Sequence, residues 1–116
     1  MTITLTLPLP PSANRNWKAS GSRVYKSVEA SQYQHDVRWE CRAAGIDPLQ
    51  GKVAVIIDAY FTHTRSDLDN VTKVLFDALN GFVWQDDRQV YQMCLTKHID
   101  RSNPRIELQV MEIETS

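Results

Sequence analysis

The segment from Lys52 to Phe61 constrains the fold most strongly, because it is apolar on both sides of an expected strand. Successive side chains of a strand point to opposite faces. Ile56 and Tyr60 belong to one face. The other face is a continuous apolar row made of Val53, Val55, Ile57, Ala59 and Phe61. Such a pattern is typical of a buried strand in the middle of a sheet, so we expect a central strand covered on both sides.

Three other segments have strand character, and two have helical character. Ile3, Leu5 and Leu7 alternate with threonines, and Pro8 ends that strand since proline cannot donate to a ladder. The other expected strands are Val90–Lys97 and Arg105–Ile113. Apolar residues at steps of three and four predict the helices. The first expected helix lies between Ser27 and the cap Gly45, and its apolar stripe is Ala30, Tyr33, Val37, Cys41 and Ala44. The second runs from about Asn70 to Asn80, and its apolar stripe is Leu68, Val71, Leu75, Ala78 and Leu79.

These elements predict a single small α+β domain over residues 1–116. Their order is β-α-β-α-β-β, and the expected architecture is a mixed four-stranded sheet packed by two helices. The segment Ser12–Ser27 is polar, basic and without clear periodicity, so it is interpreted as a long loop. Loops of that length in compact domains are often functional.

The charges are distributed unevenly. Residues 1–28 carry four cations and no acid, whereas five aspartates lie within the 21 residues from Asp67 to Asp87. A basic segment and a carboxylate cluster suit an anionic substrate; the alternative is a solvated loop with a few surface charges. The sequence has no membrane-spanning apolar run, no signal peptide and no nucleotide-binding fingerprint, so we expect a cytoplasmic protein without a nucleotide cofactor.

Asp67 and Asp69 are two residues apart just before a helix, so both carboxylates can face one point. Leu68 between them should point into the core and fix their orientation. Magnesium prefers such hard oxygen ligands. The alternative is ordinary helix chemistry, with Asp69 as the N-cap and Lys73 in ion pairs with Asp69 and Asp77 at i,i+4 spacing.

Asp86 and Asp87 follow the second helix after a short apolar return. If that return runs back toward the start of the helix, one of the two aspartates could complete a site of three carboxylates. Neighbouring residues of an extended chain point to opposite sides, so one should point toward the site. The pattern alone leaves open which one.

Three motifs carry a resemblance to a known family. LPLPPSANR (Leu7–Arg15), RSDLDNVTKVLFDALNG (Arg65–Gly81) and WQDDRQV (Trp84–Val90) resemble the RusA family of Holliday junction resolvases, over nearly the whole chain. The resemblance implies a homodimeric, Mg²⁺-dependent endonuclease of recombination and repair, often carried by phages or prophages. It would resolve four-way DNA junctions by paired symmetric nicks. The resemblance does not show which surface forms the dimer; Trp39, off the buried stripe of the first helix, is one candidate anchor.

Carried over by motif, the catalytic carboxylates and metal ligands are Asp67, Asp69 and Asp87, with one or two Mg²⁺ per subunit, and the catalytic cation is Lys73. The expected DNA contacts are Asn14, Arg15, Lys18, Arg23, Lys26 and Arg65. Family members can carry a run of arginines before the first aspartate, where this chain has only Arg65. Two alternatives stay open: a junction-binding or branched-DNA-binding protein that does not cut, and a metal-dependent nuclease acting on other branched DNA or on RNA.

Overall fold

The computed structural model describes the chain except for residues 1, 12–16, 21–22, 27, 66–67 and 114–116, and at 17–20 and 23–26 it describes the backbone alone. Four strands form one mixed sheet in the order β1-β6-β4-β5. Their bounds are β1 Thr2–Leu7, β4 Val53–Phe61, β5 Val90–Ile99 and β6 Arg105–Glu112. β6 is antiparallel to both β1 and β4, whereas β4 and β5 are parallel. The expected mixed four-stranded sheet and the β-α-β-α-β-β order are confirmed.

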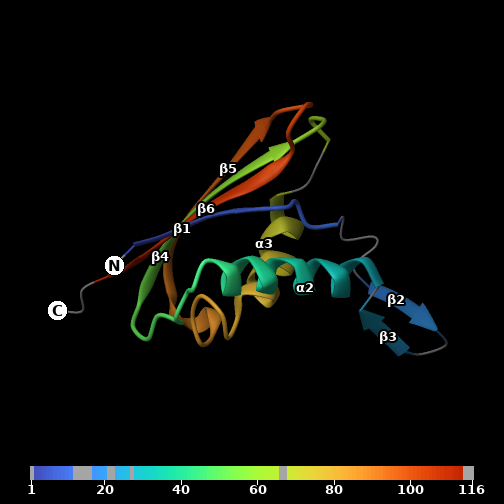
Figure 1. Cartoon of the computed structure of the whole chain (residues 1–116). Helices are drawn as coiled ribbons and strands as arrows, with labels where there is room; N and C mark the ends of the chain where they lie inside the picture. Colours follow the sequence, from blue (N-terminus) through green and yellow to red (C-terminus); the bar gives the residue numbers. More distant parts are fainter. Residues whose placement is uncertain (1, 12–16, 21–22, 27, 66–67, 114–116) are drawn as a thin grey trace.

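Two helices, α2 (Val28–Ala43) and α3 (Leu68–Leu79), lie on the same side of the sheet (Figure 1). The predicted apolar stripe of α2 is buried except for Ala44, which is exposed just beyond the last helical residue. α3 buries its stripe and also Val74, while Leu68 is partly buried against the core. Gly45 and Gly81 follow the helices with φ of 67° and 83°, a backbone conformation that favours glycine.

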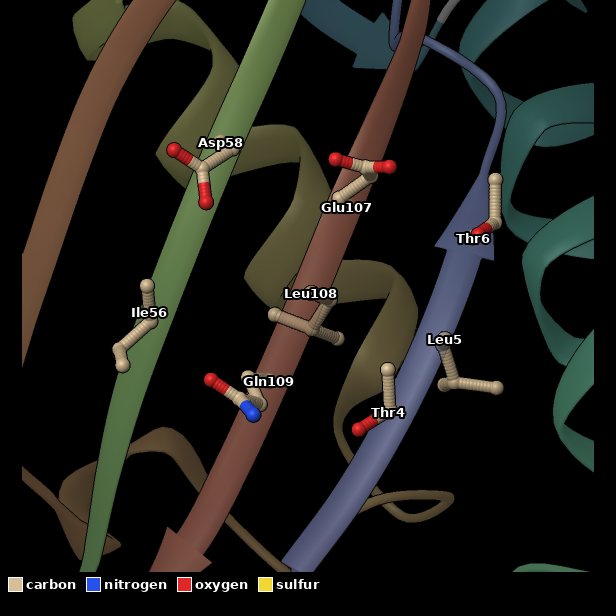
Figure 2. A pocket seen from close by; sticks show the side chains of 8 residues that line it. All are labelled: Thr4, Leu5, Thr6, Ile56, Asp58, Glu107, Leu108 and Gln109. Carbon is tan, nitrogen blue, oxygen red and sulfur yellow. The ribbon is translucent and has the colours of Figure 1, made fainter.

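β4 is a central strand, as expected, but helices cover only one of its two faces, contrary to the expectation. β4 lies between β6 and β5, and every second residue from Val53 to Phe61 is buried toward the helices. The other face stays half-exposed because both helices pack on one side. Figure 2 shows Ile56 and Asp58 on this open face, with α3 behind the sheet. The apolar character of Ile56 and Tyr60 therefore reflects a half-buried sheet surface.

The expected long loop at Ser12–Ser27 is wrong in part. The residues flanking Gly21-Ser22 form a two-stranded antiparallel sheet of β2 (Trp17–Ser20) and β3 (Arg23–Lys26). Tryptophan, valine and tyrosine favour strands, and two short runs separated by a Gly-Ser pair are typical of hairpins. The basic composition of the segment concealed that signal.

Trp84 is the largest fully buried side chain among the described residues. Its ring meets that of Phe76 edge to face, with centroids 5.1 Å apart. Packing of this kind contributes beyond simple area burial. The short apolar return after α3 is therefore part of the core, and it places the turn that follows it.

Among the described residues, no helix has both the length and the apolar character needed to cross a membrane.

Candidate active site

Asp69 and Lys73 lie one helical turn apart at the start of α3, and both are exposed. α3 begins at Leu68, so Asp69 is inside the first turn, where a carboxylate interacts favourably with the helix dipole. The partly buried Leu68 points into the core, as the sequence predicts for the residue between the two aspartates. Asp67 itself lies outside the described residues. The structure thus presents Asp69 and Lys73 to solvent at one end of α3.

The downstream aspartates have different surroundings. Asp86 caps the short 3-10 helix η1 (Asp87–Gln89): its carboxylate accepts the backbone N–H of Arg88 at 2.9 Å. The same bond is the main reason that the pKa of Asp86 lies below its ordinary value. The guanidinium of Arg88 adds an ion pair at 3.3 Å. Asp86 therefore has a structural role, and Asp87 is the better candidate for a ligand.

The side chain of Gln89 fixes the aspartate turn to the rest of the domain. Its amide oxygen accepts the backbone N–H groups of Gln85 and Asp86 at 2.8 and 3.0 Å. Its amide nitrogen donates to the carbonyls of Leu49 and Gly51 at 2.7 and 2.9 Å. Four bonds from one side chain leave the turn few alternative conformations. Gln89 is not among the site residues expected from the sequence, although Asp86-x-x-Gln89 is a recognisable capping box.

Asn80 connects α3 to the same turn. Its amide oxygen accepts the indole N–H of Trp84 at 2.6 Å, and its amide nitrogen lies 3.5 Å from a carboxylate oxygen of Asp87. At 3.5 Å the second contact is weak, which leaves the oxygens of Asp87 accessible to a stronger partner. Asp87 is half-buried, so it is placed by the fold without being sealed from solvent.

Asp69 and Asp87 lie at opposite ends of α3. Ten helical steps separate Asp69 from Leu79, a rise of about 15 Å, and Asp87 contacts Asn80 just beyond that far end. The sheet gives the same result: Val90, after η1, pairs with Val53 at the start of β4, whereas the segment leading to α3 leaves the end of β4. The return after α3 does not run back toward the helix start, contrary to the sequence-based expectation.

One copy of the chain therefore does not bring Asp69 and Asp87 to one ion. Ligands of Mg²⁺ lie about 2 Å from the metal, so their oxygens must be only a few ångströms apart. Consistent with this, the described part of the chain contains no group of three or more His, Cys, Asp or Glu side chains close enough to hold a metal.

Three of the six expected DNA contacts lie on the β2–β3 hairpin, where the backbone register is known: Lys18 pairs with Tyr25, Arg23 with Ser20, and Lys26 with Trp17. Asn14 and Arg15 lie outside the described residues. Arg65 is exposed in the segment between β4 and α3. Trp39 is also exposed, at 60% of its surface, and so is available for contact.

A second polar cluster lies on the open face of the sheet. The carboxylate of Asp58 lies 2.7 Å from Nε2 of His98, and the ring of His98 stacks on that of Tyr60 at 4.5 Å. The guanidinium of Arg105 lies 3.8 Å from the centroid of Tyr60. A hydrogen bond to Glu107 is the main cause that raises the pKa of Tyr60. The cluster joins β5, β4 and β6 at the end of the sheet from which the α3 segment leaves; no sequence motif indicated it.

Comparison with known proteins places the chain in a family. A family model described as endodeoxyribonuclease RusA matches residues 8–111. The chain belongs to the RusA family. It is 35% identical to the crossover junction endodeoxyribonuclease RusA of Escherichia coli K12 and of Shigella sonnei, and 34% identical to that of Enterobacteria phage 82. Each comparison covers 97% of this chain and 96% of the relative.

Proposed function

We propose that this chain is a Mg²⁺-dependent endodeoxyribonuclease that resolves four-way DNA junctions by paired nicks on opposing strands. One observation carries the proposal: the RusA family match spans residues 8–111, and the carboxylates and lysine of the family motif all stand within it. A protein that only bound junctions would not need Asp67, Asp69, Lys73 and Asp87 together. The relatives named as crossover junction endodeoxyribonucleases, one of them from a phage, support the same substrate.

The donor set fits a magnesium ion. Asp67, Asp69 and Asp87 would supply the hard oxygens that this ion prefers. When bound, a divalent metal polarises the phosphate and lowers the pKa of a water molecule. Lys73, one turn beyond Asp69 on the exposed side of α3, would place its ammonium against charge that develops on the scissile phosphate.

We infer that the site is completed by a second copy of the chain. Asp69 and Asp87 lie at opposite ends of α3, so one protomer cannot offer both to one ion. A two-fold axis that sets two α3 helices antiparallel brings the start of one helix to the end of the other. Each dimer would then hold two equivalent sites, each with Asp67 and Asp69 from one copy and Asp87 from its partner. Two sites related by a two-fold axis suit a junction that is itself two-fold symmetric.

Mixing two inactive variants tests this arrangement. Asp69→Asn and Asp87→Asn should each abolish cutting alone. After the subunits are mixed and exchanged, about half of the dimers carry one copy of each, and one of their two sites has every carboxylate, so about a quarter of the nicking activity returns. If all carboxylates came from one copy, every site in the mixture would be defective. No recovery, with subunit exchange verified by a tagged copy, would overturn the shared site.

The basic hairpin would hold the DNA. Asn14, Arg15, Lys18, Arg23, Lys26 and Arg65 would contact phosphates, which position a substrate without reading its sequence. Junction affinity should therefore fall steeply with salt, because each neutralised phosphate releases counterions. The β2–β3 hairpin supports this role, since it carries three of these cations on one small element away from the main sheet (Figure 1).

The deciding experiment compares substrates. A mobile four-way junction, a flap and a linear duplex are each incubated with the protein and Mg²⁺, and the nicks are mapped on every strand. Symmetric nicking of the junction alone is expected. Comparable cutting of the flap or of RNA would favour a different metal-dependent nuclease, and binding without cutting would favour a junction-binding protein. Asp69→Asn should retain junction binding and lose cleavage; normal cutting by this variant would reject the metal assignment.

A further inference from the structure

The segment that leaves β4 toward α3 is held by donors from the end of β5 and the turn that follows it. The backbone N–H of Asp100 donates to the carbonyl of Phe61 at 2.8 Å. The Arg101 guanidinium donates to the carbonyl of Thr62 at 2.8 Å, and the ammonium of Lys97 donates to the carbonyl of Thr64. Three bonds thus hold the four residues 61–64.

The turn that supplies Arg101 is itself well organised. The carboxylate of Asp100 accepts the backbone N–H groups of Ser102 and Asn103, both at 3.2 Å, and the hydroxyl of Ser102 at 3.0 Å. It also pairs with the Arg105 guanidinium at 3.0 Å. Arg105 stacks on Tyr60, within the polar cluster of the open sheet face. The donors to residues 61–64 therefore rest on an ordered part of the sheet.

The carbonyls that Lys97 and Arg101 bind do not need a protein donor. Thr62, His63, Thr64 and Arg65 are all exposed, so water could satisfy their carbonyls. Instead, two long charged side chains give up rotamer freedom to hold that backbone. Thr64 lies four residues before Leu68, where α3 begins, and three before Asp67, the first carboxylate of the family motif. Because so short a connection has little reach, holding residues 61–64 limits where the chain can enter α3, whose exposed start carries Asp69.

We propose that Lys97 and Arg101 are positioning residues of the metal site. They hold the segment from Phe61 to Thr64 so that the start of α3, with Asp69, keeps one position in the absence of metal. The inference rests on the proposed function, since it assumes that these carboxylates bind Mg²⁺. Groups that orient metal ligands typically change metal affinity by one to two orders of magnitude when they are lost.

The direction in which Mg²⁺ affinity changes separates a positioning role from a purely electrostatic one. A cation close to a metal site repels the metal, so its removal alone would tighten Mg²⁺ binding. Loss of a tether loosens the ligands and weakens Mg²⁺ binding. A cation that only contacted DNA phosphates would change junction affinity and its salt dependence, and would leave the metal requirement unchanged. Lys97→Met therefore distinguishes three roles by direction.

The experiment uses the full chain with Lys97→Met, Lys97→Arg, Arg101→Met and Arg101→Lys. Arg42→Met is the matched control, because it removes a cation from α2 that takes no part in the site. Each variant is measured for the Mg²⁺ concentration that gives half-maximal cutting, for kcat, and for junction affinity without Mg²⁺. Amide hydrogen exchange of residues 62–66 and the shift of Tm with Mg²⁺ give readouts that do not depend on cleavage.

The two methionine variants should raise the half-saturating Mg²⁺ concentration by about tenfold or more. They should also lower kcat, speed hydrogen exchange at residues 62–66 and reduce the Mg²⁺-dependent shift of Tm, while junction affinity stays near the parent value. Lys97→Arg should keep most of the Mg²⁺ affinity and activity that Lys97→Met loses, because the longer guanidinium retains both the charge and a hydrogen-bond donor. The Arg42→Met control should match the parent protein in all five readouts.

Contrary results are equally specific. Weaker junction binding with an unchanged Mg²⁺ requirement would make Lys97 a phosphate contact and overturn the proposal, as would tighter Mg²⁺ binding. If Lys97→Met does not fold, Arg101→Met decides, since Arg101 is exposed on a turn. If the parent protein does not cut junctions, the proposed function has failed, and if Asp69→Asn still cuts them, the metal assignment has failed. If that variant is inactive while both methionine variants behave as the parent does, only the positioning role has failed.

Discussion

The carboxylate of Asp87 lies 3.5 Å from the amide nitrogen of Asn80, the residue that directly follows α3. This contact places Asp87 at the far end of the helix from Asp69. The two residues belong to the same family motif set, so their separation within one chain needs an explanation. The shared site proposed above would provide one, and the residues that hold Asp87 would then matter for a neighbouring subunit.

Asn80→Ala should destabilise the domain and impair cutting. The variant leaves the buried indole N–H of Trp84 without its 2.6 Å acceptor, and an unsatisfied buried donor costs about 1–3 kcal/mol. Thermal or urea unfolding measures this loss. Gln50→Ala, at an exposed position, is the control and should be nearly neutral. An Asn80→Ala protein as stable as the parent would show that water satisfies Trp84.

Gln89→Glu separates the donor role of this side chain from its acceptor role. The carboxylate still accepts the N–H groups of Gln85 and Asp86, but it cannot donate to Leu49 and Gly51 and repels both carbonyls. We expect Gln89→Glu to lose about 2 kcal/mol or more in the free energy of unfolding. Gln92→Glu, on the exposed part of β5, controls for the added charge. Equal unfolding curves for the two variants would contradict the donor role.

Parts of this site could be predicted from sequence because they depend on local geometry. The spacing of Asp69 and Lys73 fixes their relation on one helix, and Leu68 fixes which side faces the core. The position of Asp87 depends on which end of β4 lies beside the start of β5. That pairing joins segments far apart in the sequence, so no local sequence pattern predicts it. The bonds from Lys97 and Gln89 likewise join residues more than thirty positions apart. Residue propensities alone would have predicted the β2–β3 hairpin, but the charges of that segment favoured its interpretation as a loop.

The two cysteines should react very differently with thiol reagents. Cys41 is buried in α2, and burial is the main cause that raises its pKa to about 11, with a smaller contribution from Glu40. The thiolate is the reactive form, so Cys41 should stay unmodified in the folded protein. Cys94 is exposed on β5 and should react quickly. A chromogenic disulfide reagent should titrate one thiol per native chain and two after unfolding, and Cys94→Ser should remove the fast reaction.

The ion pair of Asp100 and Arg105 should weaken in acid. The hydrogen bond from Arg105 is the main cause that lowers the pKa of Asp100 below its ordinary value of 3.8. A depressed folded-state pKa stabilises the protein above the ordinary value and loses that contribution as pH falls through the lowered one. A double-mutant cycle of Asp100→Asn and Arg105→Gln measures their coupling energy. It should be constant from neutral pH to about pH 5 and shrink below pH 4; a coupling that persists unchanged in strong acid would contradict the assignment.

Mg²⁺ and dimerisation should stabilise each other if each metal site contains carboxylates from two copies. Linkage is reciprocal, so a metal that binds only across the interface must tighten the dimer, and dimerisation must tighten metal binding. Sedimentation at several protein concentrations, with Mg²⁺ or with a chelator, measures the dimer dissociation constant directly. It should fall with Mg²⁺ in the parent protein and stay unchanged in Asp69→Asn and Asp87→Asn. Arg42→Met should respond as the parent does. If Mg²⁺ raises Tm equally at all protein concentrations and leaves the dimer constant unaffected, all the ligands must come from one copy.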